Sequence, residues 1–226
     1  MPVPADPQAS RKGVAGQAAD HLRAAVLSGE LPAGTPLREP DLAAKLGVGR
    51  GTVHEALGLL EREGLVVSEL HRVAEVRELT PQDVEELYTL RVALDVLAMR
   101  TAAGKDTAAL EAVVEKMRHA RTDAERVALD IEFHDAVYAA TGHRRLVEAW
   151  RAIRSQVHLF LLARAVGDAA YRDLLVPEHA ALVAVLNGGG ADEAGQAAED
   201  HLRGSYAKLV DRPGGTGRSR EPAGRP

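Results

Sequence analysis

The sequence predicts a mainly α-helical protein built from two parts. Hydrophobic residues make up 46% of the chain but aromatic residues only 3%, so Leu, Val and Ala must fill the core, a composition that favours helices. The hydrophobic pattern also changes once, near Leu79. Short helices and β-branched runs precede that point, and only helical periodicity follows it. The chain therefore divides into a small mixed part and a larger all-helical part.

Three helices and a two-stranded hairpin are predicted in the N-terminal part. Apolar side chains recur at helical spacing, and Gly punctuates the ends of the short helices. Two β-branched runs on either side of a short polar stretch predict the hairpin. In chain order, the predicted elements span residues 14–27, 39–46, 50–63, 65–68 and 73–76. Three helices followed by such a wing form a winged helix-turn-helix, which we place at residues 13–79.

The chain is predicted to be helical from residue 80 to residue 210. Thr80 is a good N-cap, with Pro81 at the first helical position. About six consecutive helices without strand signals form an antiparallel bundle. Residues 1–12 and 211–226 are rich in Pro, Gly, Ser and Arg, which predicts disordered tails. The predicted helices of the bundle span residues 81–103, 107–120, 123–140, 144–165, 168–186 and 192–210.

The composition limits the classes of function. The chain has no cysteine, which excludes disulfides and thiolate metal sites and fits a cytoplasmic location. No apolar run is long enough for a membrane helix, and residues 1–10 lack the apolar core of a signal peptide. The net charge is −5, and residues 1–79 carry 9 basic against 11 acidic side chains. Any contact with DNA would therefore depend on a local basic surface.

The strongest local motif of the N-terminal part lies at residues 42–57, where apolar residues are spaced to pack two helices across a tight turn. The second helix presents Arg50, Gly51, Thr52 and His54 near its N-terminal end, where a recognition helix meets base edges. Arg can bind guanine with two hydrogen bonds, Thr can contact a phosphate or a thymine methyl group, and Gly permits close approach. The spacing alone leaves open a helical hairpin without a ligand.

Residues 14–79 resemble the GntR family of bacterial regulators. The resemblance rests on segments that include Leu31-Pro-Ala-Gly-Thr-Pro-Leu37, Leu46-Gly-Val48 and Glu55-Ala-Leu57. It implies a DNA-binding regulator in which Arg50 and its neighbours contact double-stranded operator DNA. We add Arg38 and Arg72 as expected DNA contacts, the latter near the tip of the wing.

The chain departs from the family pattern at several DNA-facing positions. Gly49, Gly51 and His54 stand where the family usually has Ser or Thr, Thr, and Arg, and Val73 replaces a glycine at the wing tip. These changes remove phosphate donors. We therefore expect an atypical operator or weaker binding.

Four ionisable residues lie on apolar stripes of the predicted bundle. Asp130 and His134 are one helical turn apart and share a face, while His179 and His201 each lie on the apolar face of another helix. Ionisable groups in such places need partners or a metal. One carboxylate and three imidazoles suit Zn, Ni, Mn or Fe. By spacing alone, histidines with hydrogen bonds in the core and an ordinary Asp130–His134 pair remain open alternatives.

Residues 79–210 resemble the effector domain of the FadR-like branch of the GntR family, in its metal-binding form. The matching motifs include Leu87-Tyr-Thr-Leu-Arg91, Asp130-Ile-Glu-Phe-His134, Glu178-His179 and Asp200-His-Leu202. The resemblance implies that all four ionisable residues bind a divalent metal ion. It also implies a homodimer, usually a repressor, that responds to a small organic acid. The loop after the second motif departs from the family, with His143 in place of Asn.

Arg91 is the candidate effector-binding residue. It lies on the apolar stripe of the helix predicted at residues 81–103, so we expect its side chain to point inward. A guanidinium forks well onto a carboxylate, which fits a clamp for an acidic effector. A salt bridge with Asp95, one turn further along the helix, is an equally good interpretation.

Two other functions remain possible at this stage. The adjacent pair His134-Asp135, with His119 upstream, could indicate a metal-dependent phosphohydrolase of helical fold. Against an enzyme, Asp135 lies on a different helical face from Asp130, and the winged part would have no role. A regulator whose metal is purely structural is the other alternative. We expect a regulator and not an enzyme.

Overall fold

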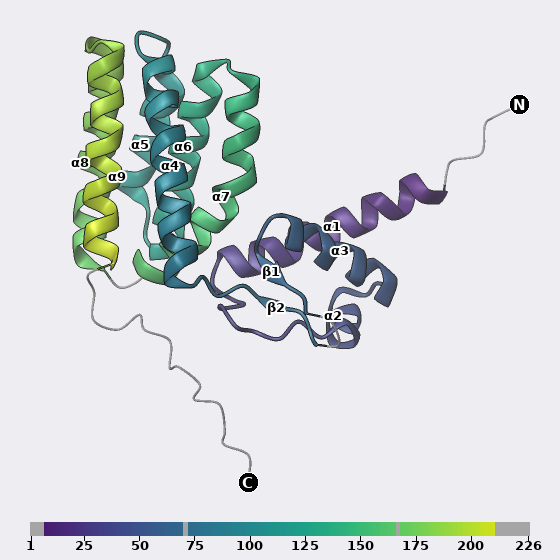
Figure 1. Cartoon of the computed structure of the whole chain (residues 1–226). Helices are drawn as coiled ribbons and strands as arrows, with labels where there is room; N and C mark the ends of the chain where they lie inside the picture. Colours follow the sequence, from purple (N-terminus) through teal and green to yellow (C-terminus); the bar gives the residue numbers. More distant parts are fainter. Residues whose placement is uncertain (1–6, 70–71, 166–167, 211–226) are drawn as a thin grey trace, which may run out of the picture.

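The computed structural model describes residues 7–69, 72–165 and 168–210. Figure 1 shows helices α4 to α9 side by side with roughly parallel axes, and a smaller group formed by α1, α2, α3, β1 and β2 beside them. The mainly helical fold class is confirmed. The elements are α1 (Pro7–Leu27), α2 (Glu39–Leu46), α3 (Arg50–Arg62), β1 (Val66–Val67), β2 (Glu75–Val76), α4 (Pro81–Ala102), α5 (Ala108–His119), α6 (Asp123–Thr141), α7 (Arg144–Ala165), α8 (Ala169–Gly188) and α9 (Ala191–Val210).

The small group is built around α3, which packs against both α1 and α2. The chain passes from α2 to α3 through Gly47, whose φ of 66° lies in the left-handed region that Gly adopts without strain. β1 and β2 pair antiparallel with Val66 opposite Val76. The apolar sides of these elements share one core, which includes Ala19, Val26, Val53, Leu60 and Leu65.

Two details of the N-terminal part differ from the sequence prediction. α1 begins at Pro7 and includes residues 7–12, whose composition predicts a disordered tail. Proline suits the first helical position, and the Gln, Ala, Arg and Lys that follow it are good helix formers. The strands are also shorter than predicted. β1 spans Val66–Val67 and β2 spans Glu75–Val76, so residues 65, 68, 73 and 74 of the predicted strands are not part of the paired ladder.

The segment before α2, which the sequence predicts as a turn, pairs with β2 of the small sheet. The N–H of Gly34 donates to the carbonyl of Val76 at 2.8 Å, and the N–H of Leu37 donates to the carbonyl of Ala74 at 2.7 Å. β2 therefore lies between β1 and residues 34–37. The sequence did not show this pairing, because Gly and Pro in the segment indicated only a turn.

The larger group is held in place by well-capped helices. The Thr80 side chain accepts a hydrogen bond from the Asp83 backbone N–H, and the Asp83 side chain accepts one from the Thr80 N–H in return. Thr122 and Glu125 form the same capping box at α6. α4 packs against α6, α7 and α9, and α5 packs against α6 and α8.

In the part of the chain that the structure describes, none of the helices is long and apolar enough to cross a membrane.

α7 joins the two groups. Its Leu159 is buried in the core of the small group, although the rest of that core comes from residues 18–76. The neighbouring His158 is buried and forms a hydrogen bond with the backbone of Leu27 at the end of α1. Gln156, on the same helix, lies against Gly64. One stretch of α7 therefore holds the winged part against the bundle.

Gly64 offers a test of this contact. Gly64→Ala is expected to destabilise the chain by about 2 kcal/mol or more, because φ is +72° there and a new Cβ would lie 2.6 Å from Gln156. Gly47→Ala is the matched control, since φ is +66° but no atom lies within 4 Å of the new Cβ. We expect the control to cost about 1 kcal/mol in urea unfolding, from backbone strain alone.

The double variant Gly64→Ala/Gln156→Ala separates the two contributions. The double variant should lose the part of the destabilisation that comes from the clash with Gln156. It should keep the part that comes from backbone strain at the positive φ of residue 64. Equal destabilisation by Gly64→Ala and Gly47→Ala would show that Gln156 moves aside without cost and that the contact is not tightly packed.

Candidate metal centre and DNA-reading surface

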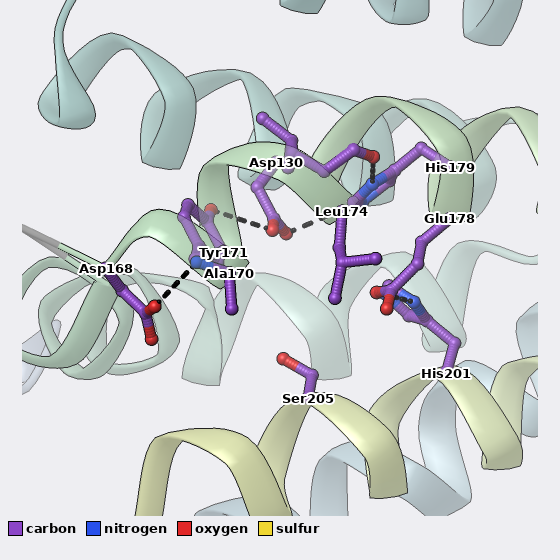
Figure 2. Close-up of a pocket in the computed structure, with 10 residues that line it drawn as sticks. Asp130, Asp168, Ala170, Tyr171, Leu174, Glu178, His179, His201 and Ser205 are labelled. Atoms are coloured by element: carbon purple, nitrogen blue, oxygen red, sulfur yellow. Dashed lines mark hydrogen bonds and ion pairs between the residues drawn. The ribbon is translucent and has the colours of Figure 1, made fainter. Parts of the chain in front are cut away.

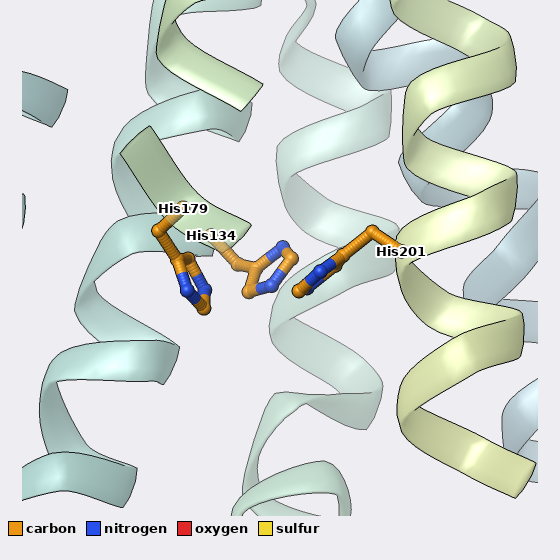
Figure 3. A group of neighbouring side chains, drawn as sticks. All are labelled: His134, His179 and His201. Atoms are coloured by element: carbon orange, nitrogen blue, oxygen red, sulfur yellow. The ribbon is translucent and has the colours of Figure 1, made fainter. Parts of the chain in front are cut away.

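Three histidines from three helices converge inside the bundle. Their ligand atoms all lie within 4.8 Å of one another, with His134 from α6, His179 from α8 and His201 from α9 (Figure 3). Asp130 lies one turn before His134, and its Oδ1 atom is 3.6 Å from His134 Nε2 and 3.9 Å from His179 Nε2. The structure therefore brings together all four residues that the sequence singled out as metal ligands.

Four polar atoms of this cluster are buried and lack hydrogen-bond partners. This holds for Asp130 Oδ1, His134 Nε2, His179 Nε2 and His201 Nδ1. The last of these lies 3.3 Å from a Glu178 carboxylate oxygen, an ion-pair distance. Leaving a polar group buried and unpaired costs about 1–3 kcal/mol. One carboxylate and three imidazoles that converge in this way fit a divalent transition-metal ion.

Two of the imidazoles are held in the tautomer that a metal ligand needs, by contacts to the ring nitrogen that points away from the cluster. His179 Nδ1 donates to the carbonyl of Leu175 at 2.7 Å, which leaves the lone pair on Nε2, the atom that faces the cluster. His134 Nδ1 lies 3.2 Å from Asp95 Oδ2, which favours the same tautomer. The hydroxyl of Tyr138 donates to the other oxygen of Asp95. The sequence indicates Asp95 only as a partner of Arg91, and its place beside the metal site was not predicted.

The electrostatics of the cluster keep its carboxylates charged and His179 neutral. Burial lowers the pKa of His179 to about 3. Burial alone would raise the pKa of Asp130, but its electrostatic interactions with the imidazoles of His179 and His134 and with Arg91 outweigh that effect and hold the pKa below its ordinary value. Asp95 behaves in the same way, with a pKa of about 2 set by His134 and Arg91 against the effect of burial. Deprotonated ligands are the form that a metal ion requires.

A small pocket opens onto the cluster between α8 and α9. Figure 2 shows Asp130, His179 and Tyr171 on one side of it, with Ser205 and His201 of α9 on the other. The Tyr171 hydroxyl donates to Asp130 Oδ2 at 3.0 Å. Burial, followed by the negative charge of Asp130, raises the pKa of Tyr171 well above its ordinary value, so it stays a donor. The cavity volume is about 20 Å³, close to the size of one water molecule.

Arg91 points inward, as the stripe predicted. It is only 7% exposed, and its guanidinium lies 5.8 Å from the centre of the Trp150 ring. Its Nε atom is 3.4 Å from Asp95 Oδ2, which is the predicted pair at one helical turn, but this distance and geometry do not make a hydrogen bond. Arg91 is therefore a buried cation whose ion pair with Asp95, on its own helix, is loose.

The residues named for a phosphohydrolase do not assemble a second metal site. Asp135 accepts hydrogen bonds from the indole N–H of Trp150 at 2.6 Å and from two nitrogens of Arg154. His119 lies on the surface, where it pairs with Glu115 at 3.1 Å. Neither residue reaches the histidine cluster.

The first turn of α3 is open to solvent. Arg50 and Gly51 are exposed and Thr52 is half-buried, while Val53 is fully buried and anchors the helix in the core. Among the residues that the structure describes, no carboxylate forms a salt bridge with Arg50. Its guanidinium is available to a DNA base or phosphate.

Arg38, His54 and Arg72 line a groove of about 950 Å³ between α2, α3 and the wing. His54 Nδ1 is 2.9 Å from a Glu39 carboxylate oxygen, and Arg72 pairs with Glu69 at 2.7 Å. Glu69 reduces the positive charge that Arg72 offers to phosphate, and Glu39 places a negative charge beside His54. The Glu69–Arg72 spacing was visible in the sequence, whereas the pairing of Glu39 with His54 was not. His71, at the predicted wing tip, lies outside the described residues.

Comparison with known proteins assigns the family. Residues 14–76 match the family described as bacterial regulatory proteins, gntR family. Residues 86–204 match the FCD domain, which covers more than half of the chain. The chain belongs to the GntR family of bacterial regulators. Its predicted resemblance to this family is confirmed.

Individual GntR relatives agree with this assignment. The chain is 31% identical to a probable D-xylose utilization operon transcriptional repressor of Paenarthrobacter nicotinovorans, over 85% of this chain and 87% of the relative. It is 27% identical to the gluconate operon transcriptional repressor of Bacillus licheniformis, over 68% of this chain and 65% of that protein. A GntR regulator structure from Rhodococcus sp. RHA1 superposes with a TM-score of 0.78 at 26% identity, over 87% of this chain and 97% of that one. This GntR protein is thus a transcriptional regulator and not an enzyme.

Proposed function

We propose that this GntR regulator is a homodimeric repressor whose helical domain binds a divalent metal ion and a small organic acid. The observation that carries the proposal is the convergence of buried donor atoms of Asp130, His134, His179 and His201 with no hydrogen-bond partners. Groups in a purely structural polar cluster are normally satisfied by one another or by water. Here Asp130 Oδ1 lies 3.6 Å from His134 Nε2 and 3.9 Å from His179 Nε2, and none of these three atoms has a hydrogen-bond partner.

The bound ion would supply a concentrated positive charge that attracts a carboxylate. The four side chains would hold the ion, and Asp95 and the Leu175 carbonyl would hold two of the rings in their ligand tautomers. A pocket leads to the cluster, which favours a ligand-responsive site over a purely structural one. Arg91 would be a second anchor for the acid.

A dimer follows from the way that winged domains read DNA. Two copies related by a two-fold axis can bind two half-sites of a symmetric operator. A bound acid would then change the angle or separation of the two winged parts and release the operator. Relatives named as repressors support the same direction of control.

Elemental analysis of the purified chain, followed by an acid screen, tests the proposal. We expect bound Zn, Ni, Mn or Fe, and we expect carboxylic acids to raise the melting temperature only while the metal is present. An acid that binds and releases operator DNA equally well after the metal has been fully stripped would contradict the scheme.

The DNA-reading role of α3 can be tested at Arg50. Arg50→Ala is expected to weaken operator binding by about 1–3 kcal/mol, because a two-pronged contact to guanine would be lost. Fluorescence anisotropy with labelled operator measures this effect. Arg62→Ala is the matched control, since Arg62 is exposed in the last turn of the same helix. Equal affinities for Arg50→Ala and the unmodified chain would remove Arg50 from the reading surface.

A further inference from the structure

A second pocket lies beside the metal cluster, between α4, α7 and α9. Its lining is almost entirely apolar or aromatic, and the polar exceptions besides two tyrosine hydroxyls are Arg91 and Ser205. Ser205 also lines the pocket that opens onto the cluster, so the two cavities are adjacent. The apolar and aromatic walls come mainly from Val84, Leu87, Tyr88, Phe160, Leu161 and Tyr206.

Arg91 is the charged group of this pocket. Its side chain is more than nine-tenths buried, and its Nε atom has no hydrogen-bond partner. A buried guanidinium is stabilised by an anion that accepts its hydrogen bonds directly, and Asp95 at 3.4 Å does not. Arg91 lines this second pocket, and its positive charge also acts on Asp130 and Tyr171, which line the neighbouring cavity.

We infer that this combined site selects an aromatic monocarboxylic acid. The carboxylate would lie between Arg91 and the metal cluster, and the ring would fill the apolar pocket. The inference rests on the proposed function and narrows its effector class. A polyhydroxylated sugar acid fits poorly, because each hydroxyl left unpaired against these walls would cost about 1–3 kcal/mol. A site that offers one buried cation and apolar walls discriminates strongly in favour of an acid with an apolar body.

The pocket must open to admit this ligand. Its cavity volume is about 20 Å³, which is too small for a ring. Tyr88 and Tyr206 both line the pocket, and their rings stack with centroids 4.0 Å apart and planes 18° apart, which links α4 to α9. Both tyrosines are partly exposed, so they can swing toward solvent. An aromatic ligand would replace this contact with one of the same kind.

Calorimetric titration of the metal-loaded, full-length chain tests the inference. Benzoate and phenylacetate are expected to bind at least about 10-fold more tightly than gluconate. Arg91→Met should weaken benzoate binding by at least about 10-fold and leave the metal content unchanged. Arg100→Met is the matched control, because Arg100 lies on the same helix, is half-exposed and pairs with Asp192 at the surface. It should leave benzoate affinity unaltered.

Ser205→Leu provides a second variant that does not alter the buried charge. It adds bulk where the two pockets meet, so benzoate binding should be lost while the fold and the metal content persist. Gluconate binding as tight as benzoate, no binding of any aromatic acid, or benzoate binding that both variants leave intact would each overturn the inference. If gluconate binds and releases operator DNA, the inference fails and the proposed function stands. If an acid releases operator DNA equally well with and without chelator, the proposed function itself is wrong.

Discussion

Removal of the metal ion is expected to lower the melting temperature of the full-length chain by roughly 5–10 °C. The reason is that the buried donor atoms of Asp130, His134, His179 and His201 would lose their shared partner. Calorimetry before chelation, after chelation and after reloading measures the effect. His179→Ala should abolish the response to chelator. His119→Ala is the control, because that histidine is 77% exposed and lies on α5, away from the cluster.

The same measurement has an expected pH dependence. In the metal-free fold burial lowers the pKa of His179 from 6.5 to about 3, so the unfolded chain binds the proton more tightly than the folded chain. The stability contributed by neutral His179 is therefore fully present above about pH 6.5. It is lost as the pH falls toward 3, by at most about 1.4 kcal/mol per pH unit. Protons also compete with the ion for the imidazoles, so the response to chelator should fade in the same range.

A melting temperature that does not change on chelation at neutral pH would contradict this expectation. So would a response to chelator that grows on acidification. In either case the histidine cluster would have to be stabilised by contacts other than a metal ion.

The helix boundaries could be predicted because their signals are local. Thr80 followed by Pro81 marks the start of α4, and Gly47 and Gly142 end α2 and α6 in left-handed conformations that favour Gly. The pairing of residues 34–37 with β2 depends on contacts between distant segments. Local residue types cannot reveal such a pairing, because Gly and Pro indicate a turn in either case.

In the candidate site, too, features set by local sequence could be predicted and contacts between distant segments could not. Asp130 and His134 are one turn apart, so their common face could be predicted from helical geometry. The partner of His134 on its other side is Asp95, a residue of α4 whose approach depends on how α4 packs against α6. Tyr171 reaches Asp130 across 41 residues of sequence. These contacts depend on the packing of separate helices, which periodicity along one helix does not specify.

Leu159→Ala is expected to uncouple the helical domain from the winged part. Leu159 is 5% exposed and extends from α7 into the core built by α1, α3 and the small sheet. Replacing a buried Leu with Ala costs about 2–5 kcal/mol, and here the loss falls on the contact that joins the two parts. Phe160 and Leu161, the next residues of α7, line the pocket beside Arg91. A shift of α7 caused by the acid would therefore reach the winged part directly through its neighbour Leu159.

The variant should still bind metal and acid, but the acid should release operator DNA at least several-fold less effectively. Amide hydrogen exchange should accelerate in α1 and α3, because their shared core loses a side chain. Leu146→Ala is the matched control, since Leu146 is 3% exposed on the same helix but lies in the core of the bundle. It should cost similar stability, raise exchange within the bundle and leave acid-induced release intact. If both variants respond to the acid like the unmodified chain, the signal does not pass through α7, and the contact at Leu159 serves only to hold the two parts together.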